Sequence, residues 1–218
     1  MAAGRRGRKA RVAQIFDRLA AENPEPRTEL EYANPYCLLV AVVLSAQATD
    51  KSVNAATAKL FKVADTPEKM AALGEQGLIP FIASIGLFRT KARNVVALSR
   101  KLLDECGGQV PLRREALESL PGVGRKTASV VLNELGAEAA IAVDTHVFRV
   151  AHRLGLSKGK TTAEVEKDLM AVTPPERRTR AHHWLILHGR YTCLARRPRC
   201  ERCVVADLCP SRELFLGA

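Results

Sequence analysis

The stretch L-P-G-V-G-R-K-T-A, residues 120–128, decides the fold class because it joins two short helices through a glycine-rich turn. A helical segment over 113–119 precedes it, and a helix over about 125–135 follows and stops at Gly136. The G-x-x-x-x-G-K-[ST] loop of nucleotide hydrolases is absent, and two glycines in three residues are too few to wrap a triphosphate. The stretch predicts two helices whose glycine turn lets backbone N–H groups approach a phosphate, with an ordinary helix–helix corner as the alternative.

Lys126 lies in the first turn of the second helix of this unit. The positive end of the helix dipole, burial and the neighbouring Arg125 would each disfavour its ammonium form. A lysine that loses its proton readily is a nucleophile and forms Schiff bases, whereas a phosphate clamp works best with a charged lysine. The position therefore permits a catalytic lysine, and a phosphate contact remains the alternative.

The segment I-A-V-D-T-H, residues 141–146, offers a carboxylate as a partner for this lysine. Asp144 follows three apolar residues and precedes an apolar helical pattern over 147–154, so we expect it to cap that helix. A capping carboxylate can also face a cleft, where it accepts a proton or stabilises a developing cation. We expect both roles to hold together at Asp144, and we interpret His146 as a supporting group rather than a metal ligand.

Apolar residues recur with a helical period along most of the chain. Period-two alternation and hairpin signals are missing, so the predicted fold is mostly or wholly α-helical. The valine-rich segment 36–47 is interpreted as a buried helix, although it resembles a strand in composition. Thr49 or Asp50 is expected to cap the next helix, and separate short helices are expected over 67–73 and 75–84.

The formal net charge is +11, from 34 Lys and Arg against 23 Asp and Glu, which points to a polyanionic partner such as DNA or RNA. A merely soluble basic protein is the alternative. Residues 5–11 form a basic block that is expected to be a disordered arm. The longest apolar run, 37–44, is too short to span a bilayer, and no apolar core follows the basic block, so we expect a soluble intracellular protein.

Four of the six cysteines crowd into 17 residues with the spacing C-x6-C-x2-C-x5-C: Cys193, Cys200, Cys203 and Cys209. In a basic intracellular protein this spacing indicates metal ligation before disulfides, and it leaves zinc and an iron–sulfur cluster equally open. The loop also holds three arginines that an ordered cluster would present to a phosphate backbone: Arg196, Arg197 and Arg199. A solvated basic loop is the alternative. Cys37 and Cys106 are expected to be buried or incidental thiols.

Five segments in order along the chain resemble the endonuclease III family of bifunctional DNA glycosylases, in the helix-hairpin-helix superfamily. They are L-S-A-Q-A-T-D (44–50), L-P-G-V-G-R-K-T-A (120–128), I-A-V-D-T-H-V-F-R-V (141–150), H-H-W-L-I-L-H-G-R-Y-T-C (182–193) and the four-cysteine loop. The resemblance implies an all-α fold of two helical lobes that flank a DNA-binding cleft. One lobe would be a six-helix barrel with the hairpin, over 28–138. The other would join 1–27 to 139–218 and carry a 4Fe–4S cluster on the four cysteines.

The resemblance also implies excision of oxidised pyrimidines, such as thymine glycol, from duplex DNA, followed by β-elimination at the abasic site. The expected partner is double-stranded DNA. The chain is expected to act as a monomer inside the cell, in the cytoplasm or nucleoid if its source is a bacterium. The resemblance implies that Lys126 is the Schiff-base lysine and Asp144 the catalytic aspartate. Gln47 would fill the space of the flipped nucleotide, and Leu87 would insert as a wedge into the double helix. Gly122 and Gly124 would contact a phosphate.

The match around Leu87 is weaker, and a core leucine is the alternative there. Two other functions remain open for the whole chain: a monofunctional glycosylase that uses activated water, with Lys126 as a phosphate contact, and a DNA-binding module without catalysis.

Overall fold

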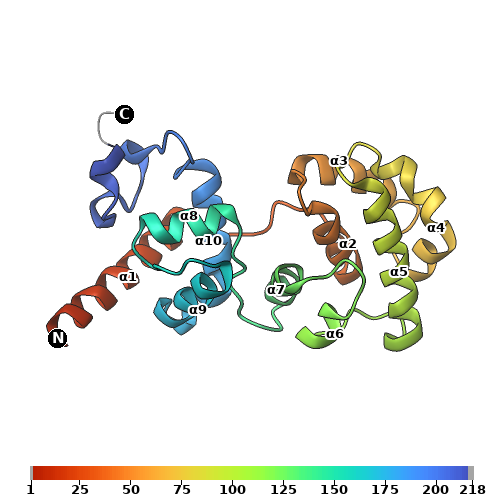
Figure 1. Cartoon of the computed structure of the whole chain (residues 1–218), viewed down its shortest axis with the longest axis horizontal. Coiled ribbons are helices and arrows are strands. Elements are labelled where there is room, and N and C mark those ends of the chain that lie inside the picture. The colour runs from red at the N-terminus through yellow and green to blue at the C-terminus, as the bar shows by residue number, and fades with distance from the viewer. Residues whose placement is uncertain (1, 216–218) are drawn as a thin grey trace. The chain divides into compact units, whose positions relative to one another are not determined.

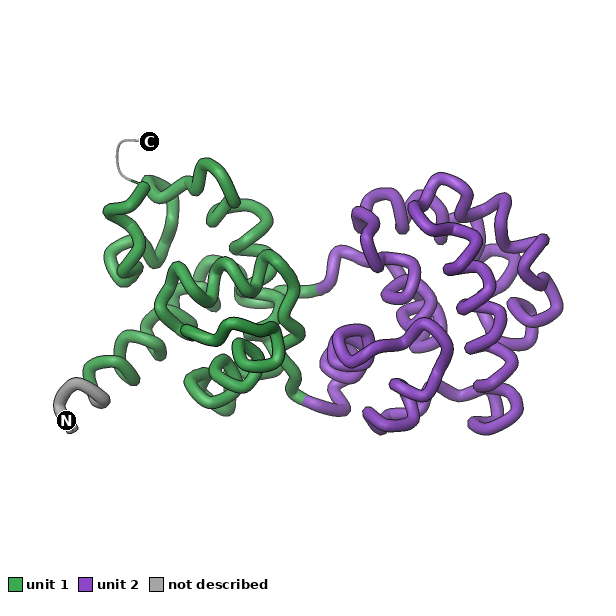
Figure 2. Tube along the Cα trace, in the orientation of Figure 1, with its two compact units in different colours: residues 1–27, 139–218 green, residues 28–138 purple. Residues whose placement is uncertain are grey.

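The computed structural model describes residues 2–215, with side chains from residue 7 onward. Within that range the chain is entirely helical, with ten α-helices, four short 3-10 helices and no strand (Figure 1), which confirms the predicted all-α class. Two compact units are formed, residues 28–138 and residues 1–27 with 139–218 (Figure 2). No helix in the described range is long and apolar enough to cross a membrane.

The unit of residues 28–138 is built around the valine-rich helix α2. Nine consecutive residues of that helix, 36–44, are buried, so it packs on all sides. The segment starts as a helix because Asn34 Oδ1 accepts a hydrogen bond from Cys37 N (2.8 Å) and Pro35 occupies the first helical position. The interpretation as a buried helix is confirmed. The α-helices of this unit are α2 (Pro35–Ser45), α3 (Asp50–Leu60), α4 (Pro67–Ile82), α5 (Phe88–Cys106), α6 (Arg114–Glu118) and α7 (Arg125–Glu134).

Local signals set several boundaries in this unit. Thr49 caps α3 by accepting from Ser52 N, as expected. The two short helices expected over 67–84 form the two parts of α4, which is kinked at Gly74, where φ is 66° and the backbone is not helical. Helix α5 ends at Gly107 in the left-handed conformation that favours glycine.

The second unit, residues 1–27 with 139–218, joins both ends of the chain around one core. Its apolar centre includes a helical stripe from α1 that comprises Val12, Ile15, Phe16 and Leu19. Residues of α8, α9 and α10 complete that core. The elements are α1 (Ala2–Glu22), α8 (Thr145–Arg153), α9 (Thr162–Val172), η1 (Pro175–Arg177), α10 (Arg178–Tyr191), η2 (Cys200–Arg202), η3 (Ala206–Leu208) and η4 (Arg212–Phe215).

The prediction of a disordered basic arm is wrong, because α1 begins at Ala2 and its backbone runs as a helix through the basic block. Arg11 Nη1 donates to the carbonyl oxygens of Leu154 and Leu208, each at 2.9 Å, and Arg8 donates to Leu156 O (3.4 Å). Leu154 caps the C-terminus of α8, where the helix dipole favours a cation. The block is therefore partly structural. The structure describes the side chains of this block from residue 7 onward, so the predictions for residues 5 and 6 fall outside the described side chains.

Candidate functional site

The glycine turn between α6 and α7 gives its two glycines different roles. Gly122 has φ +79°, and a Cβ there would lie 2.9 Å from the Cβ of Asn94 on α5. The fold itself therefore requires glycine at 122. Gly124 has φ −96° as the N-cap of α7, and a Cβ there would meet nothing within 4 Å. Nothing in the described protein requires glycine at 124, so its missing side chain leaves room for an external group near the first N–H groups of α7.

We expect alanine substitutions to separate these two roles. Gly122→Ala should lower the free energy of unfolding by roughly 1–2 kcal/mol, because alanine is strained at positive φ and its methyl group meets Asn94. Gly124→Ala should leave the free energy of unfolding within about 1 kcal/mol of the wild type but weaken binding to duplex DNA. Urea unfolding and fluorescence anisotropy measure the two effects. Equal losses of stability in both variants would contradict the assignment.

Lys126 is the second residue of α7 and is exposed to solvent. Ala128, Val131 and Leu132 are buried and anchor the opposite face of the helix, which turns position 126 outward. No described residue makes a hydrogen bond or an ion pair with its amine. The sequence-based expectation of burial at this lysine is wrong for the free protein, and the amine is open to an approaching substrate.

Asp144 is the N-cap of α8, as predicted. Its Oδ1 accepts a hydrogen bond from Val147 N (2.8 Å), and the side chain is half-buried. No described residue hydrogen-bonds to Oδ2, which leaves that oxygen available for chemistry. The buried ring of His182 on α10 donates from Nδ1 to Ala142 O (3.0 Å), which fixes the backbone two residues before the carboxylate. Lys126 belongs to the unit 28–138 and Asp144 to the other unit.

Gln47 and Leu87 share an unusual backbone. They are the two non-glycine residues with positive φ in the described range, at 55° and 60°. Such a conformation costs about 1–2 kcal/mol for an ordinary residue, and strain of this kind often marks a functional position. Both side chains are exposed, Leu87 by 59%, which excludes the core-leucine alternative. The two turns are neighbours, since a Cβ on Gly86 would lie 3.8 Å from Gln47 O.

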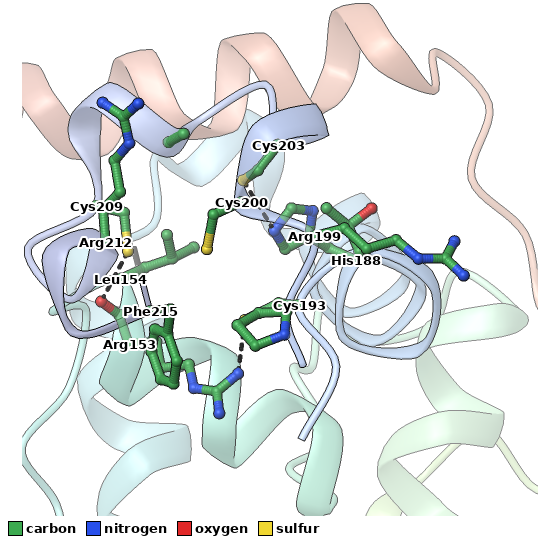
Figure 3. Close-up of a pocket in the computed structure, with 13 residues that line it drawn as sticks. Arg153, Leu154, His188, Cys193, Arg199, Cys200, Cys203, Cys209, Arg212 and Phe215 are labelled. Carbon is green, nitrogen blue, oxygen red and sulfur yellow. Dashed lines mark hydrogen bonds between the residues drawn. The ribbon is translucent and has the colours of Figure 1, made fainter. Parts of the chain in front are cut away.

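The four clustered cysteines line one pocket in the unit that joins the chain ends (Figure 3). Four thiols around one pocket form a donor set that suits an iron–sulfur cluster or a tetrahedral zinc ion. Burial raises the pKa of Cys203 to about 11, so a thiolate there needs a compensating cation. Cys37 and Cys106 do not line this pocket.

Sequence reasoning missed three residues that support the cysteine loop. Arg153 on α8 donates to Cys193 Sγ (3.4 Å) and to Leu194 O (2.6 Å). Arg149, one turn earlier, donates to Cys193 O (3.0 Å). His188 is buried on α10 with Nε2 at 3.6 Å from Cys203 Sγ, and burial lowers its pKa to about 4. The arginines stand four residues apart on one helix face, which was the available signal, but their carbonyl partners lie about forty residues away in the sequence.

We expect the purified protein to be brown and to contain iron and acid-labile sulfide in place of zinc. Removal of the metal by a chelator should open the loop 193–209, because the metal held by the four cysteines would be the main cross-link of this loop. Trypsin should then cleave after the exposed Arg196 and Arg199 faster than in the loaded protein, whereas Pro198 protects the bond after Arg197. An active, colourless, zinc-loaded preparation would contradict the cluster.

The loop arginines are exposed, as a phosphate-contacting surface requires. No described residue pairs with the guanidinium groups of Arg196 and Arg197. Arg199 donates to Tyr191 O (3.3 Å), which orders its side chain at the C-terminal end of α10. The three cations therefore extend from a loop fixed by its cysteines.

Two family models match the chain. Residues 40–175 match the HhH-GPD superfamily of base excision DNA repair proteins, and residues 193–209 match the iron–sulfur binding domain of endonuclease III. The second match covers the span of the four cysteines.

Curated relatives and solved structures agree with these models. Endonuclease III of Treponema pallidum (strain Nichols) is 59% identical over 91% of this chain and 94% of its own length. Endonuclease III of Escherichia coli (strain K12) is 53% identical over 94% of this chain and 97% of its own length. A trapped endonuclease III–DNA covalent intermediate with an estranged adenine aligns with TM-score 0.89 and 44% identity, covering 95% of this chain and 98% of that one. A non-covalent endonuclease III–DNA complex aligns with TM-score 0.90 and 43% identity, covering 96% of this chain and 99% of that one.

Proposed function

The chain belongs to the endonuclease III family of base excision DNA repair proteins, and from that premise we propose that Lys126 and Asp144 carry its chemistry. The chain is a DNA glycosylase and abasic-site lyase that binds DNA and holds a 4Fe–4S cluster. The observation that carries the proposal is the exposed amine of Lys126, without a partner among the described residues, on the first turn of the hairpin helix. Since no described residue holds this amine, it is available to a sugar carbon.

The substrate is a duplex that contains an oxidised pyrimidine. C1′ of a stacked nucleotide is out of reach, so the damaged nucleotide must first leave the helix. Unstacking costs a few kcal/mol and least for a damaged base that stacks poorly. Gln47 fills the vacated space and Leu87 enters the stack beside it. Their exposed side chains and adjacent strained turns support this role.

The amine of Lys126 attacks C1′ of the extruded nucleotide, and the bond from C1′ to the base breaks. The attacking amine loses a proton, and the departing base gains one. The free Oδ2 of Asp144 either accepts the proton from the amine or stabilises the positive charge that develops on the sugar. The sugar ring opens to an iminium, which acidifies the hydrogen on C2′. Loss of that proton expels the 3′ phosphate and breaks the strand, and water then hydrolyses the imine and frees Lys126.

We infer a structural task for the 4Fe–4S cluster, which the four cysteines would hold. When bound, it cross-links the four cysteines and contributes to folding of the loop 193–209. Arg149, Arg153 and His188 hold the carbonyl and sulfur atoms of Cys193 and Cys203 in place around it. Such partners fix the orientation of the ligands.

A duplex with one thymine glycol and a 5′ label on the damaged strand tests the function. We expect a shortened labelled fragment that ends in an unsaturated aldehyde, formed without alkali. An abasic strand that breaks only in alkali would indicate the monofunctional alternative. No base release and no cleavage would indicate a binding module without catalysis, and would overturn the proposal.

Arg196, Arg197 and Arg199 contact DNA phosphates in this proposal. Reversal of all three charges to glutamate should weaken binding to undamaged DNA and flatten its dependence on salt, by about 0.9 in log–log slope for each phosphate that is no longer neutralised. The matched control reverses Lys158, Lys160 and Lys167, three exposed lysines of the same unit. An unchanged slope in the arginine variant, or an equal change in the control, would remove the loop from the interface.

We also propose that the chain acts as a monomer in the bacterial cytoplasm, at the nucleoid. The bacterial sources of its relatives support this location. Light scattering should give a mass near 23.8 kDa, and a stable dimer would contradict the proposal.

A further inference from the structure

The first turn of α5 carries two cations where a helix disfavours them. Arg89 and Lys91 lie in this turn, the turn contains no acidic residue, and the N-cap Leu87 provides no side-chain hydrogen bond. A helix N-terminus carries partial positive charge and unsatisfied N–H groups, so cations there destabilise the free protein. The arrangement therefore suits an anion that the free protein lacks.

Lys91 is the strongest sign of a missing partner. The residue is 5% exposed, and its Nζ is buried without a hydrogen-bond partner in the described part of the chain. Helical side chains lean toward the N-terminus of their helix, and Lys91 shares the core-facing side of α5 with the buried Ala92 and Val95, so its side chain is directed toward the first turn from the core side. Burial lowers its pKa, as expected for a cation without compensation. A positive charge in such surroundings attracts an anion more strongly than one in water.

Arg89 is the accessible member of the pair. Its guanidinium carbon lies 4.7 Å from the centre of the Phe88 ring, which holds the side chain in one orientation. The side chain is exposed, and no hydrogen bond or ion pair joins it to a described residue. A planar guanidinium with free donors matches the oxygens of a phosphate.

The first turn of α5 also lies near two elements that are proposed to contact DNA, Leu87 and the glycine turn. Leu87 immediately precedes α5, and Asn94, six residues after Phe88, contacts the hairpin at Gly122. Six residues of helix rise by about 9 Å along the axis, so the first turn of α5 and the glycine turn lie at different levels of this helix and can contact separate phosphates. Both belong to the unit 28–138.

We propose that the first turn of α5 is a second phosphate-binding site, which holds a phosphodiester of the undamaged strand beside the point where Leu87 enters. Arg89 and the first N–H groups of α5 contact the phosphate, and Lys91 adds its charge from below. The site rests on the proposed function only through the position of Leu87, and it would anchor the strand opposite the lesion while the hairpin anchors another phosphate.

The test compares Arg89→Met and Lys91→Met with Arg100→Met, an exposed cation farther along the same helix. Binding to a duplex with a stable abasic analogue is measured by anisotropy between about 50 and 200 mM salt, where the affinity of such complexes responds steeply. We expect Arg89→Met to weaken binding by about three- to tenfold and to reduce the log–log slope by about 0.9, with a smaller loss for Lys91→Met. Arg100→Met should match the wild type.

Two further measurements keep the result decisive. The midpoint of urea unfolding should stay equal or rise in Lys91→Met, because an uncompensated buried charge is removed, so a fall in both stability and affinity would indicate a structural lysine and overturn the site. Neutral methylphosphonates opposite the lesion should weaken binding of the wild type but hardly that of Arg89→Met. Equal losses in both proteins would also overturn it. If the wild type failed to bind DNA at all, the proposed function would fail first.

Discussion

Lys126→Ala is expected to lower base excision and strand cleavage by at least about 10³-fold, because the nucleophile itself is removed. The side chain is exposed and has no partner among the described residues, so the free energy of unfolding should change by less than about 0.5 kcal/mol. Single-turnover kinetics on a thymine-glycol duplex and urea unfolding measure the two quantities.

Lys126→Arg is the matched control for this prediction. A guanidinium keeps the positive charge but stays protonated, so it cannot attack C1′. We expect this variant to bind damaged DNA nearly as well as the wild type and yet to be as inactive as Lys126→Ala. Substantial activity in Lys126→Arg would show that the lysine acts through its charge, as a phosphate contact.

The second large effect is expected at Asp144. Asparagine caps helices as well as aspartate does, so Asp144→Asn should keep the hydrogen bond from Val147 N and the stability of α8. Loss of the carboxylate should nevertheless lower the rate of base excision by about 10²–10⁴-fold. Rates come from single-turnover kinetics, and stability from thermal unfolding.

Asp144→Ala separates the cap from the chemistry. It should lose a similar factor in rate and, in addition, about 1 kcal/mol in the free energy of unfolding, because Val147 N loses its acceptor. If Asp144→Asn were fully active while Asp144→Ala lost activity together with stability, the aspartate would be a cap alone.

The sequence predicted those features that depend on short-range patterns. The helical class, the caps at Thr49 and Asp144, and the break at Gly74 each follow from a few neighbouring residues. The order of the basic block could not be predicted, because the acceptors of Arg11 are carbonyl groups of residues 154 and 208, more than 140 residues away. Charge along a sequence does not show whether such carbonyls fold beside it.

The candidate site shows the same division. Its cysteines and its lysine stand in recognisable spacings, whereas the exposure of Lys126 depends on how α7 packs. The strained backbone at Gln47 and Leu87 depends on two turns that meet only in the fold, so no local pattern announces it. Lys91 looks like any helical lysine until its burial without a partner is seen.

The proposed mechanism requires that the amine of Lys126 becomes covalently joined to C1′ of the damaged nucleotide. Borohydride reduction during the reaction with a thymine-glycol duplex, followed by digestion and mass spectrometry, measures this bond directly. We expect a stable protein–DNA adduct whose nucleotide remnant lies on the peptide that contains Lys126, and no adduct in Lys126→Ala. An adduct mapped to another residue, or no adduct from an active wild-type enzyme, would contradict the mechanism.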